Sequence, residues 1–443
     1  MSSYWASLAW LGGPGLEAGV AIEVDGERIV AVRTGVASPP PGYDRLDGLV
    51  LPGLANAHSH AFQRALRGRT QRVRGSFWTW REQMYALAAR LDPDAVLTLA
   101  RATFGEMALA GVTLVGEFHY LHHAPGGKPY AEPNAIGAAV LEAAAQAGVR
   151  ITLLDACYLH GGIGVGPDQV QRRFCDADVD AWAARVDGLA GRSQARIGAA
   201  IHSVRAVDPG AASVVAAWAR DRSAPLHAHV SEQPAENDAS LRAYGATPTA
   251  VLERSGALSE SFTAVHATHV SDDDIALLGA ARASCCLCPT TERDLADGIG
   301  SARRLRDAGV RLALGSDSNA IIEPFEEARA VELDERLVSG VRGQHGGDEL
   351  LRAATAGGYA SLGWPDGGEI RAGALADLVV LGRDGVRLAG VGEEGLLDAV
   401  VFAGAAADVR DVIVGGRFVV RDGTHVSLDV PRELAAAIAR VAA

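Results

Sequence analysis

The central part of the chain alternates between short apolar runs and alanine-rich runs with helical spacing, from residue 56 to about residue 360. The apolar, strand-like runs are VTLVGEFH, RITLLDACYLH, RIGAAIHSV, PLHAHVSE, FTAVHATH, ASCCLCP and VRLALGSDS. Such alternation predicts a parallel sheet whose two faces are covered by helices. Eight such units would close a barrel, so we expect an α/β fold in which residues 56–360 form a TIM-like (β/α)8 barrel.

The two ends of the chain have a different, strand-rich pattern. Near the N-terminus, GVAIEVDGERIVAVRTG alternates and contains an Asp-Gly turn typical of a hairpin. After about residue 365, strands return in GALADLVVLG and DVRDVIVGGRFVVRDGTHV. Because these segments flank the barrel, we expect residues 1–55 and 361–443 to pair in one small β domain. The last run, RELAAAIARVAA, predicts an amphipathic helix.

Composition narrows the class of protein and of partner. Hydrophobic residues make up 48% and charged residues 21% of the chain, as in globular proteins. The net charge is −13 without any basic block, which argues against nucleic acid and against an anionic membrane as partners. An anionic ligand would therefore be bound by local arginines, because Lys128 is the only lysine.

The cysteines and the apolar runs indicate a cytoplasmic protein. The five cysteines form no C-x-x-C pair, and buried free thiols are a simpler interpretation than disulfides or a metal site. They are Cys157, Cys175, Cys285, Cys286 and Cys288. The N-terminal residues lack a basic leader, and no stretch reaches the roughly twenty apolar residues that a membrane span needs.

Polar side chains of the kind found in metal sites follow the predicted strands. One such histidine alone is more often a hydrogen-bonded core residue. In a parallel barrel, however, the C-terminal ends of all strands open on one face, where barrel active sites lie. The residues at these ends are His58, His60, His119, His202, His229, Glu232, His266 and Asp317.

Four of these residues make a plausible ligand set. His58 and His60 are two residues apart and would share one face of a strand. Together with His229 and Asp317 they offer three imidazoles and one carboxylate, which suits Zn²⁺ or another borderline divalent ion. Glu232 would then lie near the metal without binding it, and could carry a proton from water to a leaving nitrogen. Its structural alternative is a charge at a helix N-terminus.

The remaining histidines leave two alternatives open. His266 could orient or deprotonate the attacking water. His227 competes with His229, although the H-x-x-E spacing favours His229. His269 competes with His266, although His266 ends the apolar run.

Several strings carry a resemblance to a known family. LPGLANAHSH, HAHVSE, VHATH, GSDS and GALADLVVL resemble the amidohydrolase superfamily, in particular its mononuclear deaminase branch, over nearly the whole chain. The longer strings HSHAFQRALRG, SFWTWREQMY, EFHYLHH, IHSVRAV, CLCPTTE and DGIG are similar to the group in that branch that hydrolyses N-formimino-L-glutamate.

This resemblance implies a distorted (β/α)8 barrel with a β domain formed from both termini. It implies one divalent metal, most simply Zn²⁺, held by His58, His60, His229 and Asp317. It also implies a catalytic set of Glu232, His266 and Asp317. A second metal is not expected, because two-metal barrels of this superfamily usually need a strand-end lysine and Lys128 lies in a loop. The implied substrate contacts are Gln63, Arg81, Tyr120, His202 and Arg205.

The implied reaction is hydrolysis of N-formimino-L-glutamate to N-formyl-L-glutamate and ammonia in histidine degradation. Arg81 and Arg205 would each hold one carboxylate of this small dicarboxylate, unless they form ordinary surface ion pairs. A homodimer is also consistent with the family. Two alternatives are a related deaminase acting on a heterocycle such as guanine or cytosine, and a barrel without catalysis. Departures from the family pattern at Asn319 and at residues 292–300 bear on substrate choice.

Overall fold

A parallel eight-stranded sheet forms the body of the computed structural model, which describes residues 2–72 and 74–442. Its strands follow one another in chain order, and its edge strands β5 and β12 meet through a bridge between Ser59 and Asp317. The sheet therefore closes into a barrel, and the predicted α/β barrel is confirmed. Its strands are β5 (Leu54–Ser59), β6 (Val112–His119), β7 (Arg150–Cys157), β8 (Ala195–Ile201), β9 (Leu226–Val230), β10 (Phe262–His266), β11 (Ser284–Leu287) and β12 (Arg311–Leu314).

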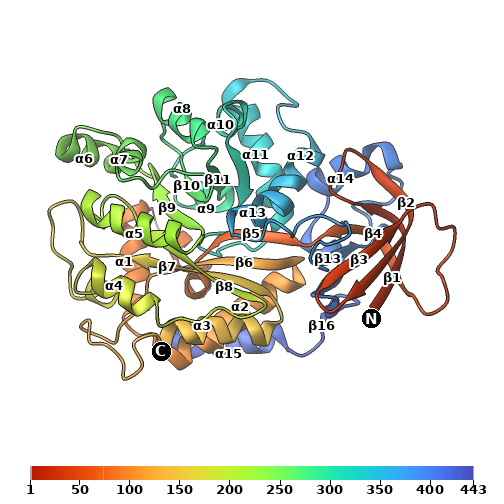
Figure 1. Cartoon of the computed structure of the whole chain (residues 1–443), viewed down its shortest axis with the longest axis horizontal. Coiled ribbons are helices and arrows are strands. Elements are labelled where there is room, and N and C mark those ends of the chain that lie inside the picture. Colours follow the sequence, from red (N-terminus) through yellow and green to blue (C-terminus); the bar gives the residue numbers. More distant parts are fainter. Residues whose placement is uncertain (1, 73, 443) are drawn as a thin grey trace.

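Helices cover the outside of this barrel (Figure 1). Strands β6 and β7 are buried along their full length, which explains why they appear as continuous apolar runs and not as alternating ones. The helices are α1 (Phe77–Ala88), α2 (Pro93–Leu109), α3 (Ala135–Ala147), α4 (Val179–Val186), α5 (Pro209–Asp221), α6 (Pro234–Tyr244), α7 (Pro248–Arg254), α8 (Asp272–Ala280), α9 (Pro289–Asp294), α10 (Ala302–Asp307), α11 (Pro324–Ser339), α12 (Gly347–Arg352), α13 (Gly358–Ser361), α14 (Leu396–Phe402) and α15 (Val430–Ala442).

A second sheet combines strands from both ends of the chain and lies beside the barrel (Figure 1). The two ends join where β4 pairs antiparallel with β13. This arrangement confirms the predicted terminal β sheet. In spatial order the strands are β16 (Thr424–His425), β15 (Arg417–Arg421), β14 (Val409–Val414), β13 (Leu378–Leu381), β4 (Asp44–Pro52), β1 (Ser2–Trp10), β2 (Leu16–Asp25) and β3 (Arg28–Arg33).

The last helix, α15, returns from the terminal sheet to the barrel and packs against α2 (Figure 1). It is the amphipathic helix expected at the C-terminus, and Ala443 lies outside the described residues. The division of the chain into domains at residues 55 and 361 stays a prediction, since β5 starts at Leu54 and α15 covers the barrel.

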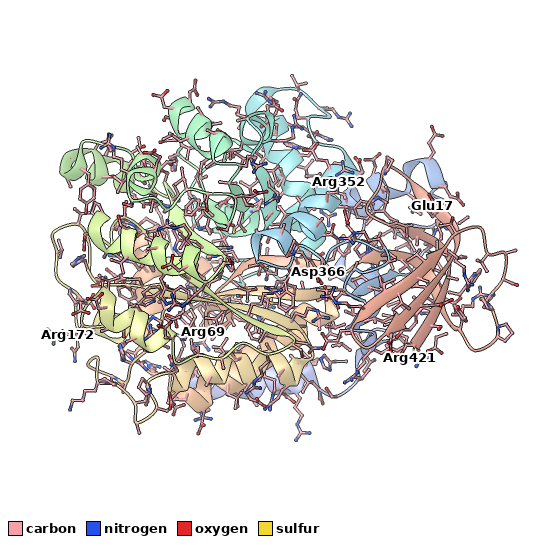
Figure 2. The ribbon with its side chains drawn as sticks, in the orientation of Figure 1. Glu17, Arg69, Arg172, Arg352, Asp366 and Arg421 are labelled. Carbon is pink, nitrogen blue, oxygen red and sulfur yellow. The ribbon has the colours of Figure 1, made fainter. Side chains whose placement is uncertain are left out.

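Local sequence signals place the elements that carry the site. Asp208 caps α5 by accepting from the Gly210 and Ala211 amides, and Pro209 occupies its first turn. Pro234 starts α6 in the same way. Charged side chains such as Arg172 and Arg421 point outward (Figure 2). Among the described residues, no helix combines the length and the apolarity needed to cross a bilayer.

Candidate metal centre and active site

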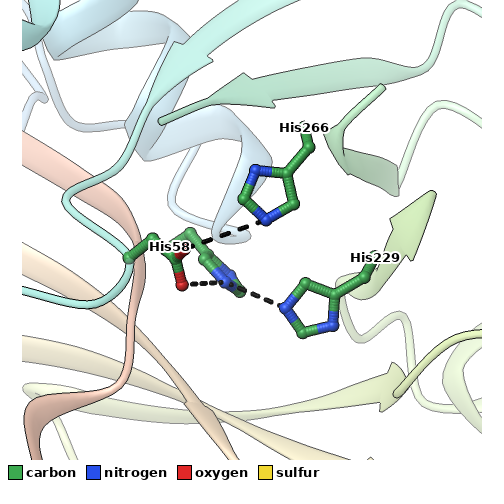
Figure 3. A group of neighbouring side chains, drawn as sticks. His58, His229 and His266 are labelled. Carbon is green, nitrogen blue, oxygen red and sulfur yellow. Dashed lines mark hydrogen bonds and ion pairs between the residues drawn. The ribbon is translucent and has the colours of Figure 1, made fainter. Parts of the chain in front are cut away.

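Three imidazoles and one carboxylate meet at the C-terminal ends of the barrel strands. Asp317 Oδ1 lies 3.2 Å from His58 Nε2 and 3.3 Å from His60 Nε2. His229 Nε2 lies 3.2 Å from His58 Nε2. Figure 3 shows the rings of His58 and His229, together with that of His266, directed to a common centre. The four residues that the sequence nominates as ligands are therefore neighbours in space.

These donor atoms fit a divalent metal. A tetrahedral zinc site with ligand bonds of about 2.0–2.1 Å has edges of about 3.3 Å, close to the observed separations. His60 Nδ1–H donates to the Phe118 carbonyl at 2.9 Å, and His229 Nδ1–H donates to the His202 carbonyl at 2.8 Å. These bonds fix the tautomer in which Nε2 carries no proton and directs its lone pair at the centre of the cluster.

Burial keeps the three rings in the form that metals bind. It lowers the pKa of His58 to about 3, and it also lowers the pKa values of His60 and His229. The rings are thus neutral at pH 7, the form of imidazole that binds metals.

Barrel closure brings Asp317 to the histidines. The Asp317 amide donates to the His58 carbonyl and the His60 amide donates to the Asp317 carbonyl, each at 2.9 Å. Asp317 adopts a φ of 45°, in the left-handed region that residues other than glycine rarely occupy. In this conformation the Asp317 side chain reaches His58 and His60, at the end of β5.

Glu232 and His266 lie beside this cluster. His266 ends β10 with a φ of 68°, and its Nε2 lies 3.8 Å from Glu232 Oε1 and 3.9 Å from Asp317 Oδ2. Donor atoms of His58, His229, His266 and Asp317 all lie within 4.8 Å of one another, so His266 is within reach of the same ion as His60. The assignment of His60 as ligand and His266 as proton-transfer group stays a prediction.

The surroundings of Glu232 and His266 shift the pKa values of both groups. Burial raises the pKa of Glu232, although His266 and Arg205 act in the opposite direction. Burial alone would lower the pKa of His266, but its hydrogen bond to Glu292 and the charges of Glu232 and Asp317 raise it well above the ordinary value. A carboxyl that accepts protons readily thus faces an imidazole that holds one, as general acid–base chemistry requires.

A cavity of about 240 Å³ opens above the cluster, and all five predicted substrate contacts line it. Gln63 Nε2–H donates to the Tyr120 hydroxyl at 3.0 Å. Arg81 stacks over Trp78 at 4.5 Å, and Arg205 NH2 lies 3.5 Å from Glu232 Oε2. The cavity therefore has a metal-type cluster at its floor and guanidinium groups on its wall. The predicted contacts along this wall are Gln63, Arg81, Tyr120, His202 and Arg205.

The competing histidines point elsewhere. His227 Nε2 is hydrogen-bonded to the Ser361 carbonyl at 2.9 Å, and His269 Nε2 to the Asp297 carbonyl at 2.7 Å. His119 packs against His122, with ring centroids 5.0 Å apart, and does not line the cavity. None of the three contributes to the ligand cluster.

Asn319, where the chain departs from the family pattern, lies below the ligands in a buried network. Its Nδ2 donates to Ser59 Oγ and to the Asp317 carbonyl, both at 3.1 Å, and its Oδ1 accepts from the Ser316 hydroxyl at 2.6 Å. It does not line the cavity, so it supports the ligand loops and does not touch the substrate space.

Sequence reasoning missed two acids of the site. Glu292 Oε1 lies 3.3 Å from His266 Nδ1 and accepts from the Cys288 amide at 2.9 Å. Glu236 lines the cavity and faces Arg205. The available signal for Glu236 was its position four residues after Glu232, in the first turn of the helix that begins at Pro234. Glu292 stands within CLCPTTE, a string that carries the family resemblance but has no metal-ligand spacing.

Comparisons with known proteins identify relatives of this chain. A formimidoylglutamate deiminase from Pseudomonas aeruginosa is 39% identical over 399 residues, which is 87% of this chain and 87% of that protein. The crystal structure of an amidohydrolase from Brucella melitensis matches all of both chains with a TM-score of 0.93 and 34% identity. An adenosine deaminase from Xanthomonas campestris with bound zinc matches 99% of this chain and 97% of its own, with a TM-score of 0.86 and 25% identity.

The family profile extends from the end of the first terminal segment to the last strands. The Amidohydrolase family profile matches residues 49–419, which include the whole barrel and every residue of the ligand cluster. This chain therefore belongs to the amidohydrolase family.

Proposed function

We propose that this chain is a deiminase that hydrolyses N-formimino-L-glutamate to N-formyl-L-glutamate and ammonia. The observation that carries the proposal is one cavity with a metal-type cluster at its floor and Arg81 and Arg205 on its wall. The reaction is the one named for the Pseudomonas aeruginosa relative, which shares 39% identity over most of both chains. Histidine degradation is the process in which such a step belongs.

The metal is proposed to be a single Zn²⁺, bound by His58, His60, His229 and Asp317. The donor set of imidazole and carboxylate suits zinc, and the Xanthomonas campestris structure has zinc bound. When bound, such an ion would lower the pKa of a coordinated water to about 7 and so supply hydroxide at neutral pH.

Glu232 and His266 are proposed to move the protons. Water adds to the formimino carbon, and Glu232 takes a proton from it. Glu232 passes this proton to the terminal nitrogen of the neutral formimino group. It then moves the remaining hydroxyl proton to the same nitrogen as the carbon–nitrogen bond breaks and the formyl C=O bond forms, so the nitrogen leaves as ammonia. His266 Nε2, which no described residue satisfies by a hydrogen bond, is free to donate to the developing oxygen.

The arginines are proposed to hold the two substrate carboxylates. The protein is strongly acidic, so these anions need local positive charge, and a guanidinium can bind a carboxylate through two parallel hydrogen bonds. Gln63, Tyr120 and His202 offer further polar contacts along the same wall. A neutral heterocycle such as guanine or cytosine would bring no negative charge to Arg81 or to the Arg205 side of the cavity, so the alternative substrate class fits this cavity less well.

We also propose that the protein is cytoplasmic. All five cysteines are free, as expected in a reducing cytoplasm. A homodimer stays a prediction, which the mass of the native protein in solution would check.

An ammonia-release assay tests the proposed function. Zinc-loaded protein is expected to release ammonia from N-formimino-L-glutamate and far less from guanine or cytosine. Chelation should abolish this release, and added zinc should restore it. Release from a heterocycle but not from N-formimino-L-glutamate would replace our proposal by the alternative.

A further inference from the structure

Arg205 stands between two buried carboxylates. It follows β8, in the turn before α5, and its side chain is 15% exposed. Its NH2 lies 3.5 Å from Glu232 Oε2, and its Nε lies 3.9 Å from Glu236 Oε2. The guanidinium thus lies between Glu232, which is proposed to move protons, and Glu236, which has no role in that chemistry.

Glu236 is fully buried, although the proposed chemistry gives it no role. It lies in the first turn of α6, its side chain is 0% exposed, and its Oε2 accepts from the Glu232 amide at 3.3 Å. Its Oε1 and the Arg205 Nε–H are both buried without a hydrogen-bond partner among the described residues. Burying a charge without compensation is costly, so its position calls for a compensating cation, and Arg205 is that cation.

The charges of these residues are linked. Although burial acts in the opposite direction, the charge of Glu236, more than that of Glu232, raises the pKa of Arg205. Burial raises the pKa of Glu236 to about 7, and Arg205 favours its ionised form. The pair is therefore strongest above neutral pH, when Glu236 carries its charge.

This arrangement separates two tasks that one acid could not perform together. If Glu232 alone balanced Arg205, each proton it accepted would remove the counterion that holds the guanidinium. With Glu236 3.9 Å from Nε, Arg205 keeps a buried counterion whatever the protonation state of Glu232, and its terminal nitrogens, of which Nη2 faces Glu232, lie at the cavity wall where an anion can bind. Glu236 thereby decouples substrate binding from proton transfer.

We propose that Glu236 is a positioning residue that holds the Arg205 guanidinium on the cavity wall, with its terminal nitrogens directed at a substrate carboxylate. The inference rests on the proposed function, because it takes Arg205 as a group that binds the dicarboxylate. It acts on binding through Arg205 and not on the reacting atoms.

A double-mutant cycle at pH 8 tests it, with Glu236→Gln, Arg205→Ala and the double variant. Glu236→Gln keeps the shape and removes the charge, and it should raise KM about ten-fold while kcat changes little. In the Arg205→Ala background, the same substitution should add almost nothing to KM. Glu236→Asp, which keeps the charge, should recover part of the loss. An equal effect of Glu236→Gln in both backgrounds, or a fall in kcat alone, would overturn the inference.

Two further measurements make the result decisive. Glu332→Gln is a matched control, because Glu332 is equally buried and pairs with Arg336 at 2.7 Å on α11, outside the cavity; its KM should be unchanged. Calorimetry measures the affinity of the same variants for the product, N-formyl-L-glutamate. Because it needs no turnover, it also tests variants that have lost activity. If wild-type protein turns over the substrate but Glu236→Gln binds the product normally, only this inference fails. If wild-type protein neither turns over nor binds a dicarboxylate, the proposed function fails with it.

Discussion

The Glu232 carboxylate, which lines the cavity, faces the His266 imidazole, with Oε1 3.8 Å from Nε2. His266 ends β10 and Glu232 follows the neighbouring strand β9, and pairs such as Val265 with His229 fix the register of the two strands. On its other side the ring is held by Glu292, 3.3 Å from Nδ1. His266 therefore keeps Nε2 directed at the place where Glu232 can exchange a proton.

Glu232→Gln should abolish most of the turnover and leave the metal in place. The amide keeps the volume of the carboxylate but cannot accept the water proton, so kcat should fall by about 10²–10⁴-fold. Measuring kcat together with the zinc content separates catalysis from metal loss. Glu335→Gln is a control, because Glu335 is a buried acid paired with Arg303 at 3.1 Å outside the cavity. A variant with wild-type kcat would remove Glu232 from the mechanism.

His229→Ala should lose the metal, whereas His227→Gln should retain it. Both histidines lie on β9, but only His229 directs its Nε2 at His58, while His227 bonds to the Ser361 carbonyl. The zinc content after dialysis against metal-free buffer should fall from about one ion per chain to far less for His229→Ala, since one of four ligands is gone. Equal zinc contents in the two variants would contradict the ligand assignment.

Arg81→Ala should raise KM about ten- to a hundred-fold and change kcat much less. It removes a charged partner of a substrate carboxylate, and hydrogen bonds to charged groups contribute about 1.5–3 kcal/mol. Arg222→Ala is the matched control, because Arg222 also stacks on a tryptophan, Trp218, at 4.5 Å but lies outside the cavity. If both variants showed the same KM, stacking on Trp78 and not substrate binding would explain Arg81.

The sequence predicts the barrel and the residues at its strand ends because both depend on local pattern. Buried strands appear as continuous apolar runs, and a polar residue at the end of such a run stands out. The same pattern cannot decide between His227 and His229, which alternation puts on one face of β9. Their positions along β9 decide between them. His227 lies two residues further from the C-terminal end of the strand than His229, and there its ring is hydrogen-bonded to the carbonyl of Ser361 in α13.

The remaining features of the site depend on contacts between distant loops. The left-handed backbone of Asp317 follows from the bridge to Ser59, and no local motif encodes it. The network around Asn319 shows the same dependence, because one of its partners, Ser59, lies 260 residues away in the sequence, on β5. The roles of Glu236 and Glu292 likewise become visible only when Arg205 and His266 have been placed beside them.

Glu327→Gln should flatten the dependence of stability on pH. Burial raises the pKa of Glu327 from its ordinary value of 4.5 to about 8, against the opposing effect of its bonds to Thr290. Between these values the folded chain holds a proton that the unfolded chain releases, so the free energy of unfolding should decrease as pH rises from about 4.5 to 8. Each unit of pKa difference corresponds to about 1.4 kcal/mol.

The amide cannot ionise, so this contribution to the pH dependence disappears in the variant. Urea unfolding of both proteins at pH 5, 6.5 and 8 provides the comparison, and the stability of the variant relative to wild type should rise steadily across the series. Arg336 pairs with Glu332 on the same helix and holds the pKa of that acid below its usual range although burial opposes it, so Glu332→Gln should not produce this rise. Parallel curves for wild type and Glu327→Gln would mean that the Glu327 carboxyl is ionised in the folded protein throughout this range.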